Sequence, residues 1–230
     1  SLFRSPKLHR KLGPREVADA EPMLRQAELV GAPLYYDCAT DDARLTLENG
    51  LDAARRGATV VTHAKVTGFE RDATGRIVAV SVHDELGGAT RRIEAGCVIN
   101  ASGPWTDAVL ALRDGDHAPM LRPTKGVHLV VDRHRLPVQH AVVCFHPVDG
   151  RGLFAIPWGD RTYVGTTDTD FEGDPADLAA TADDVAYLLG AANAYFPEAH
   201  LVDEDVISTW AGLRPLIRPP ENVSESKTSR

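Results

Sequence analysis

Cysteine is scarce in this 230-residue chain, which holds only Cys38, Cys97 and Cys144. The three are odd in number, lie far apart in the sequence and form no Cys-x-x-Cys pair. This pattern excludes a disulfide framework or a structural zinc site and favours a reducing compartment. Each cysteine is therefore interpreted as a small buried apolar residue.

Long apolar runs and an excess of positive charge are also missing. No run approaches the roughly 18 residues that a membrane helix needs, and no signal peptide opens the chain. The 25 basic and 33 acidic residues give a net charge of −8, so we expect no nucleic-acid partner. Because there is no initiator methionine, we interpret the chain as a piece of a longer, cytoplasmic protein.

The residues that are present have an ordinary globular composition, 43% apolar and 25% charged. Runs rich in Val, Ile and Thr predict strands, and apolar residues at helical spacing predict helices. We expect a mixed α/β chain in two parts that divide near residue 118. The predicted helices cover residues 43–54, 105–112 and 185–196, and the predicted strands cover residues 59–62, 64–70, 77–82, 90–93, 97–101, 127–131, 141–145, 153–157, 162–166 and 206–210.

One segment matches a dinucleotide-binding pattern on paper. Residues 150–155 read Gly-Arg-Gly-Leu-Phe-Ala, which fits G-x-G-x-x-A. The pattern works only between a strand and a helix, whose N-terminus receives the pyrophosphate. Here a β-hairpin is predicted to follow, so we do not assign this segment to nucleotide binding.

Residues 100–105, Asn-Ala-Ser-Gly-Pro-Trp, follow a predicted strand. Small residues at the carboxyl end of a strand let a ligand approach the backbone closely, and α/β sheets bind cofactors at such places. The alternative is a simple bend, set by Gly103 and Pro104, between a strand and a helix. The residues alone leave both interpretations open.

Lys125, His128 and Arg214 are further candidates for a site. A single His on a strand is more often a satisfied structural residue than a functional one. Arg214, between an apolar strand and Pro215, needs a partner for its guanidinium group. That partner is either a structural carboxylate or a bound carboxylate or phosphate. Residues 165–170, Gly-Thr-Thr-Asp-Thr-Asp, are interpreted as a turn or cap rather than a metal loop.

Seven short motifs follow one another along the chain, and their combination carries a resemblance to a known family. They are residues 36–37 (Tyr-Asp), 41–45 (Asp-Asp-Ala-Arg-Leu), 100–105, 123–128 (Pro-Thr-Lys-Gly-Val-His), 156–158 (Ile-Pro-Trp), 165–168 and 210–216 (Trp-Ala-Gly-Leu-Arg-Pro-Leu). With them the chain resembles the central part of the FAD-dependent glycerol-3-phosphate dehydrogenases, and secondarily their glycerophosphate oxidase relatives. The resemblance extends from about residue 14 onward.

The resemblance implies a two-domain flavoenzyme, with a glutathione-reductase-like FAD domain and an antiparallel-sheet substrate cap domain. Such an enzyme oxidises sn-glycerol 3-phosphate to dihydroxyacetone phosphate, passing hydride to FAD and electrons to a membrane quinone. The implied organisation is a leading helical segment (1–33), a partial FAD-binding domain (34–118), the cap (119–223) and the start of the return to the FAD domain (224–230).

The resemblance also implies roles for individual residues. His128 matches the active-site histidine, which we take as the catalytic base. Arg214 and Arg230 match the substrate-binding arginines, and Arg is suited to phosphate because its planar donors are permanently charged. The cofactor-binding residues implied are Val66 on a strand and four in the turn, namely Ala101, Ser102, Gly103 and Trp105.

The chain departs from the family pattern at both ends. The glycine-rich N-terminal segment and the C-terminal segment that closes the site are missing, so we expect this piece alone to bind no stoichiometric FAD and to be inactive. The enzyme is expected in the cytoplasm, peripheral on the inner face of the plasma membrane, and a homodimer is left open. Three alternatives stay open: an oxidase using oxygen, another amino-acid or hydroxyacid oxidoreductase, and a non-catalytic binding module.

Overall fold

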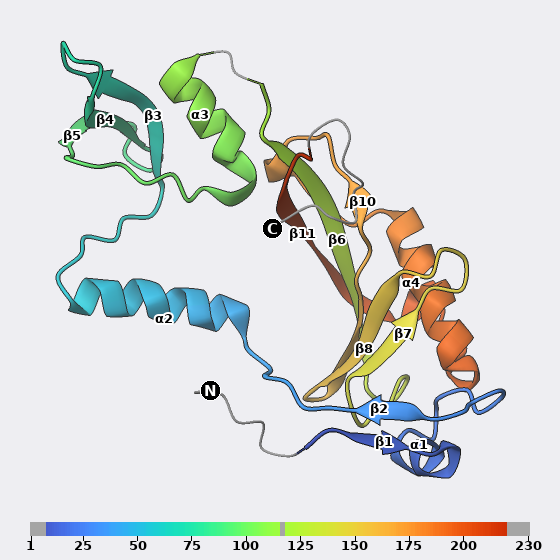
Figure 1. Cartoon of the computed structure of the whole chain (residues 1–230). Coiled ribbons are helices and arrows are strands. Elements are labelled where there is room, and N and C mark those ends of the chain that lie inside the picture. Colours follow the sequence, from blue (N-terminus) through green and yellow to red (C-terminus); the bar gives the residue numbers. More distant parts are fainter. Residues whose placement is uncertain (1–7, 116–117, 220–230) are drawn as a thin grey trace. The chain divides into compact units, whose positions relative to one another are not determined.

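The computed structural model describes residues 8–115 and 118–219. The chain folds as two compact units, one formed by residues 1–36 and 121–230 and the other by residues 37–120 (Figure 1). We call the first the sheet unit and the second the small unit, and describe each by itself. The assignment of parts of the chain to a FAD domain and a substrate cap stays a prediction.

The small unit is built on an antiparallel three-stranded sheet in the order β3-β4-β5. Gly75 and Gly88 have φ values of 84° and 72° in the turns between these strands, a region that glycine enters without steric cost. The Asp41 side chain accepts a hydrogen bond from the Arg44 N–H and so begins the long helix α2. The elements are α2 (Asp42–Arg55), β3 (Ala64–Arg71), β4 (Ile77–Asp84), β5 (Thr90–Glu94), η1 (Gly103–Trp105) and α3 (Thr106–Asp114).

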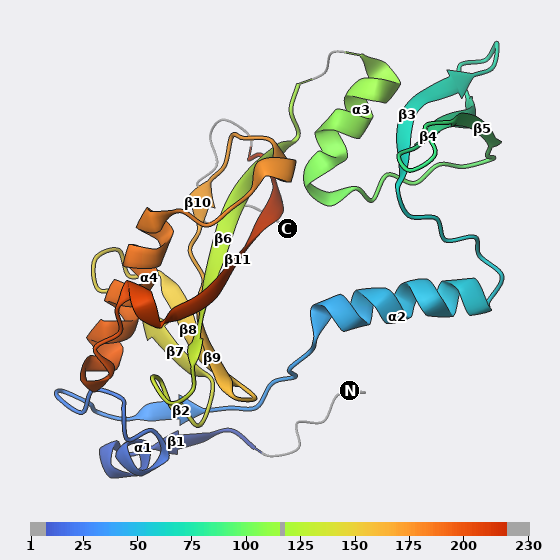
Figure 2. The ribbon, with the colours of Figure 1, turned by 180° about the vertical axis from the view of Figure 1, so that it is seen from behind.

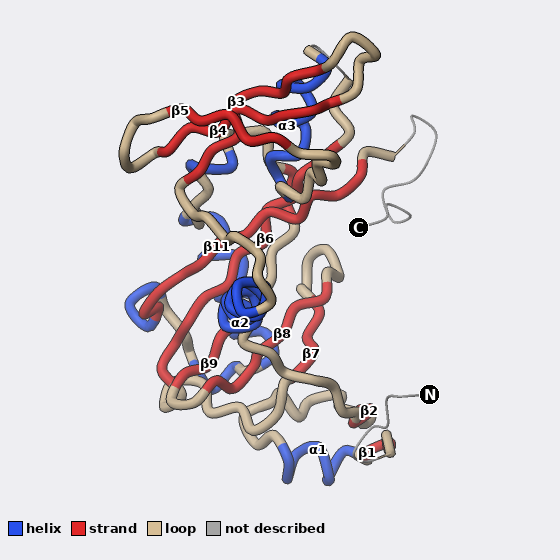
Figure 3. Tube along the Cα trace, turned by 90° about the vertical axis from the view of Figure 1, so that its left-hand side faces the viewer, coloured by secondary structure: helices blue, strands red, loops and turns tan. Residues whose placement is uncertain are grey.

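Two predicted strands of the small unit are wrong. Residues 59–62 and 97–101 are irregular, and Figure 3 draws both as loop. A strand exists only where a neighbouring strand takes its backbone hydrogen bonds, and among the described residues neither segment has one. Their side chains are accordingly exposed, as at Val61 (65%) and Ile99 (84%). The prediction that every cysteine is buried holds for Cys144 and is wrong for Cys38 and Cys97.

The sheet unit is an antiparallel sheet centred on the 12-residue strand β6. β11 pairs with β6 along one edge, while β9 and β10 pair with different parts of the other edge. β8 and β7 continue the sheet beyond β9. The elements are β1 (Arg10–Leu12), α1 (Pro14–Ala20), β2 (Ala32–Leu34), β6 (Leu121–Asp132), β7 (Val142–Phe145), β8 (Gly152–Trp158), β9 (Arg161–Gly165), β10 (Thr169–Asp170), η2 (Pro175–Asp177), α4 (Ala182–Tyr195), η3 (Pro197–Ala199), η4 (Asp203–Asp205) and β11 (Val206–Ile217).

The hydrophobic core lies between one face of this sheet and α4, which both views show beside the strands (Figures 1 and 2). Val127, Leu129 and Val131 of β6 are fully buried there, together with Leu188 of α4. Successive side chains of a strand point to opposite faces. His128, between Val127 and Leu129, is therefore on the face away from α4, which we call the open face.

A buried ion pair joins α4 to β6. The Lys125 ammonium lies 2.5 Å from a carboxylate oxygen of Asp184, and both side chains are almost fully buried. Asp184 also accepts hydrogen bonds from the backbone N–H and hydroxyl of Thr181, and Thr181 Oγ1 accepts one from the Asp184 N–H, so the two residues form a capping box. Burial by itself raises the pKa of Asp184, but the bonds from Lys125 and Thr181 outweigh it and leave the pKa below its usual value. Lys125 thus anchors the helix and does not share the open face with His128.

Replacing Lys125 tests the weight of this pair. Lys125→Met is expected to lower the free energy of unfolding by about 3–5 kcal/mol, because it leaves the Asp184 carboxylate buried without its cation. Arg44→Met is the control, since it breaks the exposed pair with Glu48 in α2 and should cost less than about 1 kcal/mol. Chemical denaturation of the complete protein measures both changes. Equal costs would show that the buried pair does not anchor α4.

Candidate functional site

His128 lies at the centre of an aromatic cluster on the open face of the sheet unit. Its ring stacks on Trp210, its cross-strand partner in β11, with centroids 4.9 Å apart and planes 14° apart. Tyr163 of β9 meets the same ring edge-on at 5.8 Å. Held between two neighbouring strands, the imidazole has a fixed orientation.

A glycine makes room for this ring. Gly165 is the partner of His128 in β9, and a Cβ atom there would lie only 2.6 Å from Cγ of the imidazole. No real Cβ contact is that short, so any other residue would push the ring away. Packing of the His128 ring therefore requires the glycine of the Gly-Thr-Thr-Asp motif.

The environment of His128 keeps its imidazole neutral. Burial lowers the pKa of His128, and the positive charge of Arg214 lowers it further. The Nδ1 atom is buried and has no hydrogen-bond partner among the described residues. A neutral imidazole near neutral pH can accept a proton, so the geometry and the charge both suit a general base.

Arg214 lies on the same face, four residue pairs from His128 along β6 and β11. Its guanidinium donates to Asp168 Oδ1 (3.1 Å), Thr166 Oγ1 (3.2 Å) and the Thr167 carbonyl (3.3 Å). It also lies over the backbone of Gly126, where a Cβ atom would stand 2.6 Å from Nη2. The structural alternative for Arg214 is thus correct in part, because a carboxylate of the chain does hold it.

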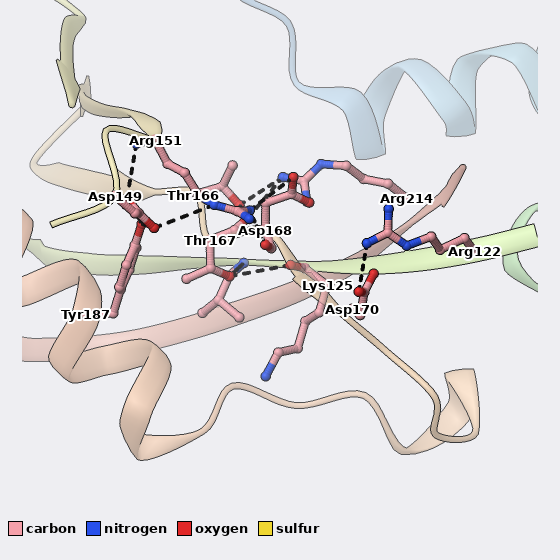
Figure 4. A network of polar contacts seen from close by, with 11 residues as sticks. Arg122, Lys125, Asp149, Arg151, Thr166, Thr167, Asp168, Asp170, Tyr187 and Arg214 are labelled. Carbon is pink, nitrogen blue, oxygen red and sulfur yellow. Dashed lines mark hydrogen bonds and ion pairs between the residues drawn. The ribbon is translucent and has the colours of Figure 1, made fainter. Parts of the chain in front are cut away.

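The carboxylates of residues 165–170 do not form the predicted cap. Asp168 pairs with Arg214 and Arg151, and Asp170 pairs with Arg122 at 2.7 Å (Figure 4). These arginines come from β11, β6 and the loop before β8, which the sequence order keeps far apart. The segment links strands through charge, and no group of three potential metal ligands occurs within residues 8–115 and 118–219.

The turn at residues 100–105 belongs to the small unit. Asn100 Oδ1 accepts hydrogen bonds from the Ser102 N–H (3.2 Å) and hydroxyl (2.6 Å), which fixes the turn before η1. Gly103 has a φ of 56°, and nothing lies within 4 Å of the place of a Cβ atom. Ala101 is exposed and Trp105 is 47% exposed. The backbone is therefore preformed and open to a ligand.

The other predicted site residues fall elsewhere. Val66 is half-buried in β3, at the edge of the small sheet, opposite Val82 of β4. It belongs with the turn to the small unit, whereas His128 and Arg214 belong to the sheet unit. Arg230 lies outside the described residues. Residues 150–155 form a hairpin turn and the start of β8, which confirms that they open no helix.

Sequence reasoning missed three contributors to the open face. Tyr163 and Trp210 were available in principle, because β9 and β11 were predicted and alternation assigns each strand two faces. What was missing was the register that places them beside His128. Arg151 had no signal at all, since its contact with Asp168 joins two loops.

The chain is similar in sequence to several known proteins. The profile of the FAD dependent oxidoreductase family matches residues 3–226. The alpha-glycerophosphate oxidase of Streptococcus pyogenes serotype M1 is 43% identical over 94% of this chain and 36% of its own length. The aerobic glycerol-3-phosphate dehydrogenase of Staphylococcus saprophyticus is 42% identical over 90% of this chain and 37% of its own.

The fold is also similar to that of a solved structure. The glycerol-3-phosphate dehydrogenase of Bacillus halodurans, complexed with FAD, superposes with a TM-score of 0.84 at 40% identity, over 93% of this chain and 45% of that one. The fold and the matched profile define a flavin-type oxidoreductase of mixed α/β architecture with antiparallel sheets. The chain belongs to the FAD-dependent oxidoreductase family. It spans little more than a third of the length of the curated relatives it matches, and none of its described helices is long and apolar enough to cross a membrane.

Adding a methyl group at Gly165 tests the packing of His128. Gly165→Ala is expected to push the ring off Trp210 and to change the ring-current shift of the His128 protons in NMR spectra of the complete protein. Gly212→Ala in β11 is the matched control, because nothing lies within 4 Å of a Cβ atom there. Equal, small shifts in both variants would contradict the packing described above.

Proposed function

We propose that the complete protein containing this chain oxidises sn-glycerol 3-phosphate to dihydroxyacetone phosphate with FAD as its cofactor. The observation that carries the proposal is the neutral His128 held on the same face as the guanidinium of Arg214. A proton acceptor on the same face as a guanidinium that can bind phosphate suits a phosphorylated alcohol. The names of the relatives that are 42–43% identical point to the same substrate.

The described residues fit a flavin cofactor at the turn of the small unit. Nothing lies within 4 Å of the place of a Cβ atom at Gly103, and Asn100 fixes the turn through two hydrogen bonds from Ser102. A planar ring can approach such a backbone closely. Ala101, Ser102, Gly103 and Trp105, with Val66, are the residues we propose to hold FAD, which supplies the acceptor for the hydride from C2 of the substrate.

The chain's own residues do the rest of the chemistry that we propose. Arg214 binds the phosphate through a planar donor set that stays charged at all working pH values. His128 takes the proton of the C2 hydroxyl, and its lowered pKa keeps it ready to accept that proton. The stack with Trp210 holds the imidazole in place and shields it from water.

The electron acceptor is the finer part of the proposal. We propose a membrane quinone, with the enzyme peripheral on the inner face of the plasma membrane, and molecular oxygen as the second candidate. Relatives named as oxidases and as dehydrogenases are equally similar to this chain, so their names do not discriminate between quinone and oxygen as the acceptor. Oxygen consumption by the complete enzyme with glycerol 3-phosphate, compared with reduction of a soluble quinone, separates the two.

The visible spectrum of the purified complete protein tests cofactor and substrate together. A flavin band is expected, and glycerol 3-phosphate added without oxygen should bleach it. A flavin band that glycerol 3-phosphate leaves unchanged would retain the cofactor and reject the substrate. Absence of flavin would favour a binding module.

Replacing His128 tests the base. His128→Ala in the complete enzyme is expected to lower kcat by about 10²–10⁴-fold and to change KM much less, because it removes a group that acts in the transition state. The acidic limb of the wild-type rate profile should lie below pH 6.5, the ordinary pKa of the imidazole, since the base must be unprotonated. An unchanged kcat, or an acidic limb above pH 6.5, would reject this role.

A further inference from the structure

A network of polar contacts leads from Tyr187 of α4, through carboxylates and guanidinium groups in turn, to Arg214 (Figure 4). The Tyr187 hydroxyl donates to both carboxylate oxygens of Asp149, at 3.1 and 3.0 Å. Asp149 pairs with Arg151 at 3.5 Å, and Arg151 pairs with Asp168 at 3.3 Å. Asp168 then accepts from Arg214 at 3.1 Å. None of these contacts beyond Arg214 is needed to explain the aromatic cluster around His128.

A ring stack and the bond to Asp149 fix the Tyr187 side chain at the α4 end of this network. Tyr187 stacks on the ring of His146, with centroids 3.8 Å apart and planes only 5° apart. Burial, followed by the bond to Asp149, raises the pKa of Tyr187 to about 12, so its hydroxyl stays protonated and donates. Asp149 also accepts from the Arg151 N–H, which fixes the loop that carries both residues. The contacts with Asp149 therefore fix the position of Arg151 independently of Asp168.

At the other end of the network, the Arg214 side chain is 22% exposed. Arg214 has five N–H donors, and the three hydrogen bonds found for it within the described residues leave donors for an anion. Arg151 pairs with Asp168 Oδ2 and donates to the Asp168 carbonyl, whereas Arg214 donates to Oδ1, so Asp168 contacts both arginines at once. The Asp168 carboxylate thus orients the guanidinium of Arg214 while it is itself bound to Arg151.

We propose that Asp168 is a positioning residue for Arg214, held in turn by Arg151, and that this contact gives the enzyme its preference for a phosphorylated over an unphosphorylated substrate. The inference rests on the proposed function and adds a residue to it. Without the Asp168 carboxylate the guanidinium would keep its charge and the bonds from Nη2 to Thr166 and Thr167, but would lose the bond that directs Nη1. Directed donors, rather than charge alone, are what a bidentate contact with phosphate needs.

Two substitutions of Asp168 in the complete enzyme separate geometry from charge. Asp168→Ala removes the acceptor, and we expect KM for glycerol 3-phosphate to rise about tenfold with a smaller change in kcat. Asp168→Asn keeps an acceptor oxygen for Arg214 and should keep KM within about threefold of wild type. The control is Asp160→Ala, which removes an 84%-exposed partner of Arg161 at the β8–β9 turn and should leave KM unchanged.

Unphosphorylated glycerol gives the specificity readout. Its kcat/KM should be the same in wild type and Asp168→Ala, because it has no phosphate for Arg214 to bind. The ratio of kcat/KM for glycerol 3-phosphate to that for glycerol is therefore expected to fall about tenfold in Asp168→Ala. A variant damaged in its fold would lose both activities together.

An NMR titration of His128 tests the positioning without any substrate. In Asp168→Ala the Arg214 guanidinium is held only through Nη2, so its position should change and the pKa of His128 should rise part of the way toward 6.5, since burial, the larger cause, remains. In Asp168→Asn the pKa of His128 should stay as low as in wild type. If glycerol 3-phosphate fails to reduce the wild-type enzyme, the proposed function fails while this titration still decides the positioning. A fall in KM in Asp168→Ala, or wild-type KM and wild-type His128 pKa in that variant, would overturn the proposal.

Discussion

The alternation of side chains along β6 is the constraint on which the sheet unit depends. Its odd-numbered residues, from Lys125 to Val131, are buried against α4, while His128 points to the opposite face. A shift of one residue in the pairing would bury the histidine and expose the lysine. The Lys125–Asp184 pair and the apolar residues beside it hold α4 on one face of the sheet. They thereby also determine which residues of β6 lie on the open face.

The functional side chains of the open face fit only because two neighbouring positions are glycines, which have no Cβ atom. Gly165 leaves room for the imidazole of His128, and Gly126 leaves room for the guanidinium of Arg214. The base and the cation thus lie directly against strand backbone. Neighbours from β9 and β11 hold His128, and residues 166–168, between β9 and β10, hold the guanidinium of Arg214. A site formed on paired strands of this kind is preorganised.

Much of this architecture could be predicted from the sequence, and the failures have physical causes. Helix α2, the capping box at Thr181 and the turn before Trp105 follow from local signals, and the structure has all three. Residues 59–62 and 97–101 have the composition of strands but no partner, which composition cannot reveal. His128 and Arg214 were identified through motifs. Their neighbours Trp210 and Tyr163 depend on register, and the Arg151–Asp168 contact depends on a loop conformation that no local pattern encodes.

The most direct test of the central claim is a crystal structure of the complete protein with FAD and glycerol 3-phosphate bound under reducing conditions. The account predicts the phosphate on the Arg214 guanidinium, with Arg214 still bonded to Asp168, and the C2 hydroxyl within hydrogen-bond distance of His128. A substrate phosphate bound away from Arg214, or a C2 hydroxyl facing a different base, would contradict it.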